Sequence, residues 1–218
     1  MVRHDGGDWT HPGNAMSFQV AILVFDAVEA LDFAGPYEVF TTASRVHGRA
    51  HPDAEALFDV SCVSSDGNPV QARAGLRVLP EHSFANSPGC DVLVVPGGVI
   101  DAAMADTATL DWIARTSAES QITASVCTGA FLLAASGVLR SGRVTTHWED
   151  VADLRARFPA LTVVEGPRWI DNGALLTSAG ISAGIDMSLH LVARLAGQAL
   201  AERTARQMDY RWLVDGAG

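Results

Sequence analysis

The stretch ITASVCTGAFLLAASGVL, residues 122–139, decides the fold of this chain. Its first five residues are small or apolar, which is typical of a short strand covered on both faces. The Ala- and Leu-rich run that follows predicts a helix that ends at Gly137. A buried strand that turns at once into a helix is the building unit of a parallel α/β sheet. The turn itself is Cys127-Thr128-Gly129.

The rest of the chain repeats this alternation of strand and helix. Patterns of apolar residues and turn formers predict strands at residues 18–25, 58–65, 91–98, 122–126, 143–146, 162–165 and 174–177, and helices at 35–46, 107–118, 129–137, 150–158, 183–195 and 198–212. Residues 70–84 predict a small hairpin centred on Ala74-Gly75. We therefore expect a single-domain α/β fold of the flavodoxin-like kind. Its mostly parallel sheet carries helices on both faces, with a small β-hairpin excursion.

Composition fits one globular domain. The chain has 218 residues, of which 48% are hydrophobic and 18% charged, enough to bury a substantial core. We expect a flexible N-terminal segment at residues 1–16 and the α/β domain at residues 17–214. The first segment is polar and contains glycine, without the apolar stretch of a signal peptide or anchor. No apolar run is long enough to predict a membrane span.

Charge and cysteine content narrow the partners. Lys and Arg number 15 against 25 Asp and Glu, giving −10, which repels nucleic-acid phosphates and anionic lipid surfaces. Three cysteines without CxxC spacing argue against a disulfide framework and a zinc site. The sequence has no phosphate loop, dinucleotide fingerprint or metal-ligand cluster. We expect a cytoplasmic protein with a small-molecule substrate, no cofactor and no metal.

Cys127 is the leading candidate for chemistry. In parallel α/β sheets, ligand sites gather beyond the carboxyl ends of strands, and Cys127 lies at such an end. A helix N-terminus is expected to lower the pKa of its thiol and favour the thiolate. The alternative is a buried structural cysteine, which is common in cores. Cys62, in a predicted strand, and Cys90, in a turn, lack the elbow position.

Two other segments could complete a site. Gly97 and Gly98 follow another predicted strand, and their backbone N–H groups, with that of Thr128, could form an oxyanion hole. A tight turn is the alternative for these glycines. Asp32 precedes Gly-Pro and, by local pattern alone, is a helix N-terminal residue stabilised by roughly 0.3–1 kcal/mol. His147 lies near a predicted strand end.

The string at residues 125–129, SVCTG, together with PGG at 96–98 and TTHW at 145–148, resembles the ThiJ/PfpI superfamily of class I glutamine-amidotransferase-like proteins. ALDFAGP at 30–36 and SAGISAGID at 178–186 are similar to isocyanide hydratases and to the ligand-sensing domains of AraC-type regulators. The resemblance extends over about residues 18–210, with the motifs in the same order. Ser125 and Thr128 depart from the amidotransferase and protease-like branches, which puts those activities in doubt.

The resemblance implies roles for particular residues. Cys127 would be the nucleophile, Asp32 the carboxyl group beside the thiol, and Thr128 a supporting hydrogen-bonding residue. His147 pairs with the nucleophile in some branches, whereas the Asp takes the acid/base role in the isocyanide-hydratase branch. Because like charges repel, Asp32 and Cys127 should share a proton and titrate as a coupled pair. The resemblance also implies that this chain forms a homodimer.

Three functions fit this pattern. The first is an isocyanide hydratase, a lyase in which Cys127 attacks the terminal carbon and Asp32 delivers a proton. The second is a non-catalytic ligand-sensing domain of the AraC-regulator type. The third is a glyoxalase-like or redox-stress protein in which Cys127 reacts with aldehydes or oxidants.

Overall fold

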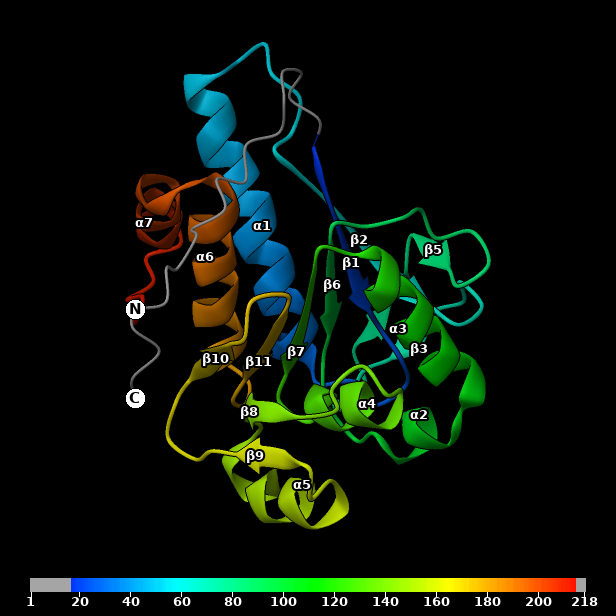
Figure 1. The fold of residues 1–218 in the computed structure, drawn as a ribbon. Helices are drawn as coiled ribbons and strands as arrows, with labels where there is room; N and C mark the ends of the chain where they lie inside the picture. Colours follow the sequence, from blue (N-terminus) through cyan, green and yellow to red (C-terminus); the bar gives the residue numbers. More distant parts are fainter. Residues whose placement is uncertain (1–16, 215–218) are drawn as a thin grey trace.

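The computed structural model describes residues 17–214, so the prediction of a flexible segment at residues 1–16 lies outside the described part. A seven-stranded sheet forms the centre, in the order β10-β11-β7-β6-β1-β2-β5 (Figure 1). Its strands are β1 (Phe18–Leu23), β2 (Phe58–Ser64), β5 (His82–Ser83), β6 (Val92–Val95), β7 (Ile122–Val126), β10 (Trp169–Asp171) and β11 (Leu175–Ser178). All neighbours run parallel except β10, which pairs antiparallel with β11. The predicted α/β class is confirmed.

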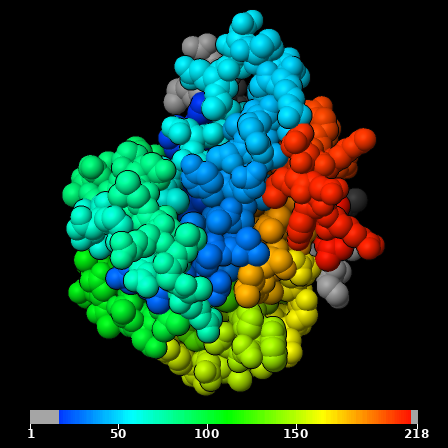
Figure 2. Space-filling model, turned by 180° about the vertical axis from the view of Figure 1, so that it is seen from behind, coloured from blue at the N-terminus to red at the C-terminus, as the bar shows by residue number. Residues whose placement is uncertain are grey.

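Helices cover both faces of the sheet. On one face lie α1 (Ala30–Ala50), α6 (Ala183–Ala196) and α7 (Gln198–Gln207), and on the other α2 (Asp101–Ala105), α3 (Thr107–Glu119) and α4 (Gly129–Ala135). Figure 2 shows α1 in blue, flanked by the orange and red C-terminal helices. Alternate residues of β1 enter opposite cores, with Ile22 in the cluster under α1 and Leu23 in the cluster under α4. A strand buried on both faces is apolar at its buried positions, which explains every residue of β1 except the half-buried Gln19.

The strand order favours a ligand crevice at the carboxyl ends of the central strands. β1 has β2 on one side and β6 on the other, so the chain changes direction across the sheet at β1. Beyond the carboxyl ends of such strands the loops diverge and leave room for a ligand. The loops that follow β1, β6 and β7 meet there.

Smaller elements surround this core. The predicted hairpin is present as β3 (Val70–Gln71) antiparallel to β4 (Arg77–Val78). β8 (Gly142–Val144) and β9 (Leu161–Val163) form a separate parallel pair next to α5 (Val151–Arg157), which follows a 3-10 turn at Trp148–Asp150. The expected strands at 143–146 and 162–165 therefore exist in shorter form, outside the main sheet.

The bounds of the first and last helices differ from the prediction. α1 runs from Ala30 to Ala50 instead of from near Gly35 to Val46, and it contains Pro36 in its second turn. Pro36 cannot donate a hydrogen bond to the preceding turn. Burial of Phe33, Val39 and Phe40 offsets that loss, and burial of this kind cannot be seen in local sequence. The last helix ends at Gln207 instead of Trp212.

Three further elements escaped the sequence patterns because they are very short. They are the helix α2, which precedes α3, the strand β10, which pairs with β11, and the edge strand β5. His82 lies in β5 of the main sheet and not in the hairpin. Within residues 17–214, no helix has the length and apolar character required to cross a bilayer.

Candidate active site

The elbow at Cys127 is a tightly determined backbone turn. β7 ends at Val126, and Cys127 adopts the left-handed conformation with φ 57° before α4 begins at Gly129. A Cβ atom on Gly129 would lie 2.0 Å from the carbonyl oxygen of Val95, so only glycine fits there. The hydroxyl of Thr146 donates to the Cys127 carbonyl at 2.8 Å. A non-glycine residue with positive φ persists where its surroundings fix it, often at functional sites.

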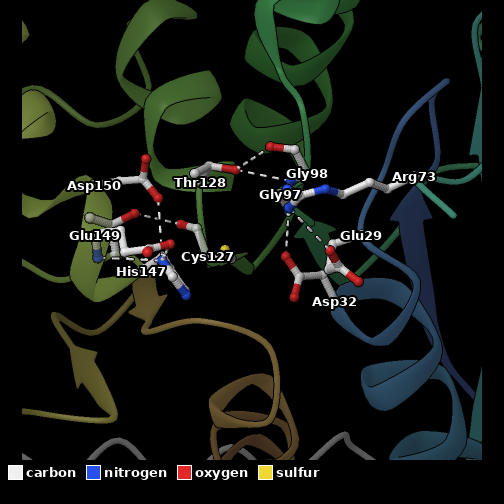
Figure 3. A network of polar contacts seen from close by, with 11 residues as sticks. Glu29, Asp32, Arg73, Gly97, Gly98, Cys127, Thr128, His147, Glu149 and Asp150 are labelled. Carbon is white, nitrogen blue, oxygen red and sulfur yellow. Dashed lines mark hydrogen bonds and ion pairs between the residues drawn. The ribbon is translucent and has the colours of Figure 1, made fainter.

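Asp32 lies near Cys127, in the first turn of α1, and is fully buried (Figure 3). The backbone N–H of Gly97 donates to its Oδ2 atom at 3.0 Å. Its Oδ1 atom has no hydrogen-bond partner among the described residues. The Cys127 thiol and the Ile181 N–H nevertheless lie near enough to influence its pKa. An unpaired buried carboxyl oxygen beside a thiol is positioned to exchange a proton with it.

Burial controls the protonation of Asp32. It raises the pKa of this carboxyl from 3.8 to about 7, helped by the charge of Glu29 and opposed by the Gly97 N–H and the Cys127 thiol. Near neutral pH the carboxyl group can therefore hold or release a proton. This is the property required of a general acid or base.

The pKa of the Cys127 thiol is raised, whereas its position at a helix N-terminus led us to expect a lowered pKa. Burial and the charge of Asp32 raise the pKa of the thiol from 9.0 to about 12, and the Thr128 N–H opposes them only in part. α4 is short and the sulfur is buried, so its dipole does not dominate. The charge of Asp32 raises the pKa of the thiol, whereas the neutral thiol lowers the pKa of the carboxyl, so each group affects the protonation of the other.

Gly97 and Gly98 do not offer free donors. The Gly97 N–H is held by Asp32, and the Gly98 N–H donates to Thr128 Oγ1 at 2.9 Å. The Thr128 hydroxyl in turn donates to the Gly98 carbonyl at 3.1 Å. Both N–H groups have acceptors within the protein in this structure, and the oxyanion hole expected from these glycines stays a prediction. They position Asp32 and Thr128, while the Thr128 N–H remains directed at the sulfur.

His147 lies across Cys127 from Asp32 (Figure 3). Its Nδ1 atom is 3.4 Å from Asp150 Oδ2 and 3.7 Å from Glu149 Oε2. Its ring packs on Gly180, where a Cβ atom would lie 2.0 Å from His147 Cδ2. The histidine is thus held in place at the site, while Asp32 remains the carboxyl group beside the thiol.

The thiol opens into a cavity of about 220 Å³. Its lining combines the expected Gly98, Cys127, Thr128 and His147 with residues that sequence patterns did not identify, namely Glu29, Arg73, Val99, Glu149, Asp150 and Ile181. Ile181 has φ 53°, unusual for a β-branched residue. Gly180, which precedes it in the sequence, hints at a tight loop but not at this conformation.

Other features of the described residues are less suited to chemistry. A hollow of about 300 Å³ beyond β1 and β2 contains no cysteine or histidine, so reactive groups and not size identify the site. Cys62 is buried in β2 with a pKa raised to about 12 by burial and Glu81. Within residues 17–214, no cluster of three His, Cys, Asp or Glu side chains is arranged to hold a metal ion.

The fold and the site together define a class of protein: a parallel α/β domain with a cysteine at a strand-to-helix elbow and a carboxylic acid beside its thiol. The family model described as DJ-1/PfpI matches residues 18–194. The chain belongs to the DJ-1/PfpI family, and the resemblance to ThiJ/PfpI proteins is confirmed.

Particular relatives differ in activity. Isonitrile hydratase of Pseudomonas putida is 36% identical over 196 residues, covering 89% of this chain and 79% of that protein. The HTH-type transcriptional regulator CdhR of Pseudomonas aeruginosa is 31% identical over 192 residues, covering 88% of this chain and 55% of the regulator. The chain therefore spans about half the length of that regulator. A crystal structure of a ThiJ/PfpI family protein from Pseudomonas syringae matches with TM-score 0.78 and 29% identity, covering 96% of this chain and 82% of that one.

Proposed function

We propose that this chain is a cysteine-nucleophile enzyme that hydrates isonitriles, also called isocyanides, to N-substituted formamides. The observation that carries the proposal is the buried Asp32 carboxyl beside the Cys127 thiol, with one oxygen unpaired and a pKa raised to about 7 by burial. The similarity to isonitrile hydratase over most of both chains supports the same choice.

The proposed reaction passes a proton through the Asp32–Cys127 pair in each of its two steps. Cys127 sulfur attacks the terminal carbon of R–N≡C, and Asp32 transfers the thiol proton to that carbon, which gives the thioimidate R–N=CH–S–Cys. Water then adds to the carbon, and one of its protons goes to nitrogen. The C–S bond breaks, the sulfur regains a proton through Asp32, and R–NH–CHO leaves. The net reaction adds one water and consumes no oxidant or reductant.

The remaining residues have supporting roles in this proposal. The Thr128 N–H stabilises negative charge on sulfur, and its hydroxyl fixes the Gly98 loop. In this proposal His147, whose Nδ1 atom lies 3.4 Å from Asp150 Oδ2, orients the water of the second step. Its role is secondary because Asp32 is the carboxyl group beside the thiol and the side chain that most raises the pKa of that thiol.

The direct test is formamide production. Purified protein is incubated with a simple alkyl isonitrile, and the product is followed by proton NMR. We expect turnover in the wild type and a loss of at least about 100-fold in Cys127→Ser and in Asp32→Asn, the range for loss of a nucleophile or general acid. The absence of formamide with the wild type would remove the proposal.

The similarity to CdhR favours a second candidate, a ligand-sensing domain. If the protein converts neither an isonitrile nor methylglyoxal but a small molecule raises its melting temperature in a dose-dependent way, sensing replaces catalysis. Conversion of methylglyoxal alone would favour the glyoxalase-like alternative, for which Cys127, Asp32 and His147 supply a thiol and two proton carriers.

We also propose that the protein works as a cytoplasmic homodimer on a small-molecule substrate. The family resemblance supports pairing, and Cys62, Cys90 and Cys127 are all free of disulfides, which suits a reducing compartment. Light scattering coupled to size-exclusion chromatography should give twice the mass of the 23.0 kDa chain. A monomer mass at micromolar concentration would contradict pairing.

A further inference from the structure

The rim of the Cys127 cavity has an unequal distribution of charge. We call the mouth the set of rim residues Glu29, Arg73, Val99, Glu149, Asp150 and Ile181. It contains three carboxylates and a single guanidinium. A substrate that enters this cavity lies beside these residues, so their charge affects which molecules arrive at the sulfur.

The one cation of the mouth is already matched. Arg73 Nη1 lies 3.6 Å from Glu29 Oε2, so these two charges largely cancel for an approaching molecule. Among the described residues, the carboxylates of Glu149 and Asp150 have one potentially cationic ion-pair partner, the Nδ1 atom of His147. Unless His147 is protonated, their two negative charges have no counterpart at the mouth.

This negative charge reaches the reacting atom. Asp150 is one of the groups that raise the pKa of the Cys127 thiol, after burial and Asp32. A charge that acts on the sulfur also acts on a charged molecule next to the sulfur. Asp150 is 34% exposed and Glu149 64% exposed, so water screens both charges without removing them.

The mouth also presents apolar surface. Val99 is 46% and Ile181 39% exposed, and both are large hydrophobic residues at the edge of the cavity. A compact apolar substituent can rest on these side chains while its electrophilic carbon faces the thiol.

We infer that the site selects uncharged electrophiles with a compact apolar substituent and excludes anionic ones, and that Glu149 and Asp150 set this discrimination. The inference narrows the substrate class and rests on the proposed function only where it concerns isonitriles. Charge exclusion at the thiol is a property of the site whether or not isonitriles are hydrated.

Two alkylating probes isolate the effect of charge. Iodoacetamide and iodoacetate react by the same displacement: the sulfur forms a bond to carbon, iodide leaves and the thiol proton passes to solvent. They have similar size and differ by one negative charge. Alkylation of Cys127 is followed by peptide mass spectrometry at pH 8 and low salt, and each rate is divided by that of N-acetylcysteine.

The wild type should favour iodoacetamide over iodoacetate by about tenfold beyond N-acetylcysteine, since one charge beside a partly solvated site changes a rate by roughly three- to tenfold. Glu149→Gln should reduce this preference about threefold, and Arg73→Gln should increase it. Glu119→Gln, an exposed change near the amino end of β7 and so at the opposite end of that strand from Cys127, should leave it unchanged. High salt should weaken the preference in the wild type.

The outcomes separate the two proposals. Equal normalised rates for both probes in the wild type, or the same ratio in Glu149→Gln and Arg73→Gln, would overturn charge selection and leave isonitrile hydration intact. If hydration occurs, an alkyl isonitrile should be converted at least tenfold faster than isocyanoacetate, and equal conversion would also overturn the inference. A protein inactive on isonitriles that still discriminates between the probes contradicts the proposed function alone.

Discussion

Asp32 and Cys127 face each other because β1 and β7 have only β6 between them in the sheet. Asp32 follows β1, Cys127 follows β7, and Gly97, which donates to Asp32, follows β6. Three adjacent strand ends therefore supply the acid, the donor that holds it and the nucleophile. The sheet order, and not proximity along the chain, creates the pair.

Replacing Asp32 should separate thiol reactivity from turnover. In Asp32→Asn the negative charge beside Cys127 is lost, so the pKa of the thiol falls and alkylation by iodoacetamide at pH 8 becomes faster, about tenfold for each unit of pKa. Isonitrile turnover should fall in the same variant because no acid remains. Alkylation rates between pH 6 and 10, assigned to Cys127 by mass spectrometry, provide the measurement. Slower alkylation at every pH would contradict the proposed repulsion.

The same substitution should alter how stability depends on pH. The pKa of Asp32 rises on folding from 3.8 to about 7, so the folded state binds a proton more tightly than the unfolded chain. The resulting stabilisation is complete below pH 3.8 and is lost as the pH rises to 7, by up to about 4 kcal/mol for a shift of three units. The Asp32→Asn variant has no ionisable group at this position, so it does not lose this stabilisation as the pH rises. Its free energy of unfolding, from urea titrations at pH 5 and 8, should therefore fall less than that of the wild type over this interval.

Much of the fold follows from local sequence. Strands such as residues 122–126 are short, continuously apolar and bounded by turn formers, and they were predicted with correct bounds. The elbow at Cys127 followed for the same reason, because strand, turn and helix patterns meet within a few residues. Such features need only local information.

The features missed depend on contacts between distant segments. The start of α1 before Pro36 depends on packing against other elements, and the positive φ of Ile181 has no signature in the neighbouring residues. The direction of the Cys127 pKa shift depends on burial and on Asp32, neither visible in the residues around the cysteine. The engaged N–H groups of Gly97 and Gly98 likewise reflect tertiary partners. The sequence identifies which groups can react, while the fold determines their protonation and which hydrogen-bond donors and acceptors remain unpaired.

Ser125 offers a stabilising substitution close to the elbow. It is fully buried in β7, and its Oγ atom has no hydrogen-bond partner among the described residues. Burial of an unpaired hydroxyl costs about 1–3 kcal/mol, so Ser125→Ala should raise the free energy of unfolding by about 1 kcal/mol. Thr177→Val is the matched contrast, because the equally buried Thr177 Oγ1 accepts the Thr145 N–H at 2.9 Å. Thr177→Val should lower stability by about 1–3 kcal/mol in the same urea titrations. Equal signs for the two variants would contradict this assignment.

Asp186 joins the C-terminal segment to the loop that carries Ile181. It is fully buried in α6, and it accepts hydrogen bonds from Arg168 Nε at 2.5 Å, the Tyr210 hydroxyl at 3.1 Å and the Leu213 N–H at 3.1 Å. Arg168 also donates to Ser182 Oγ at 3.2 Å. One carboxylate thus holds together the start of α6, Arg168 and the residues that follow α7.

Removal of this carboxylate should be among the most costly changes in the domain. Asp186→Ala leaves Arg168 partly buried without its counter-charge and should lower the free energy of unfolding by about 3–5 kcal/mol. Tyr210→Phe removes one hydrogen bond to a charged group and should cost about 1.5–3 kcal/mol. Tyr37→Phe is the control, because the Tyr37 hydroxyl has no hydrogen bond within the described residues and its loss should change stability by less than about 0.5 kcal/mol. Urea unfolding followed by tryptophan fluorescence measures all three. If Tyr210→Phe were as stable as Tyr37→Phe, the hydroxyl would not contribute to holding the C-terminal segment on α6.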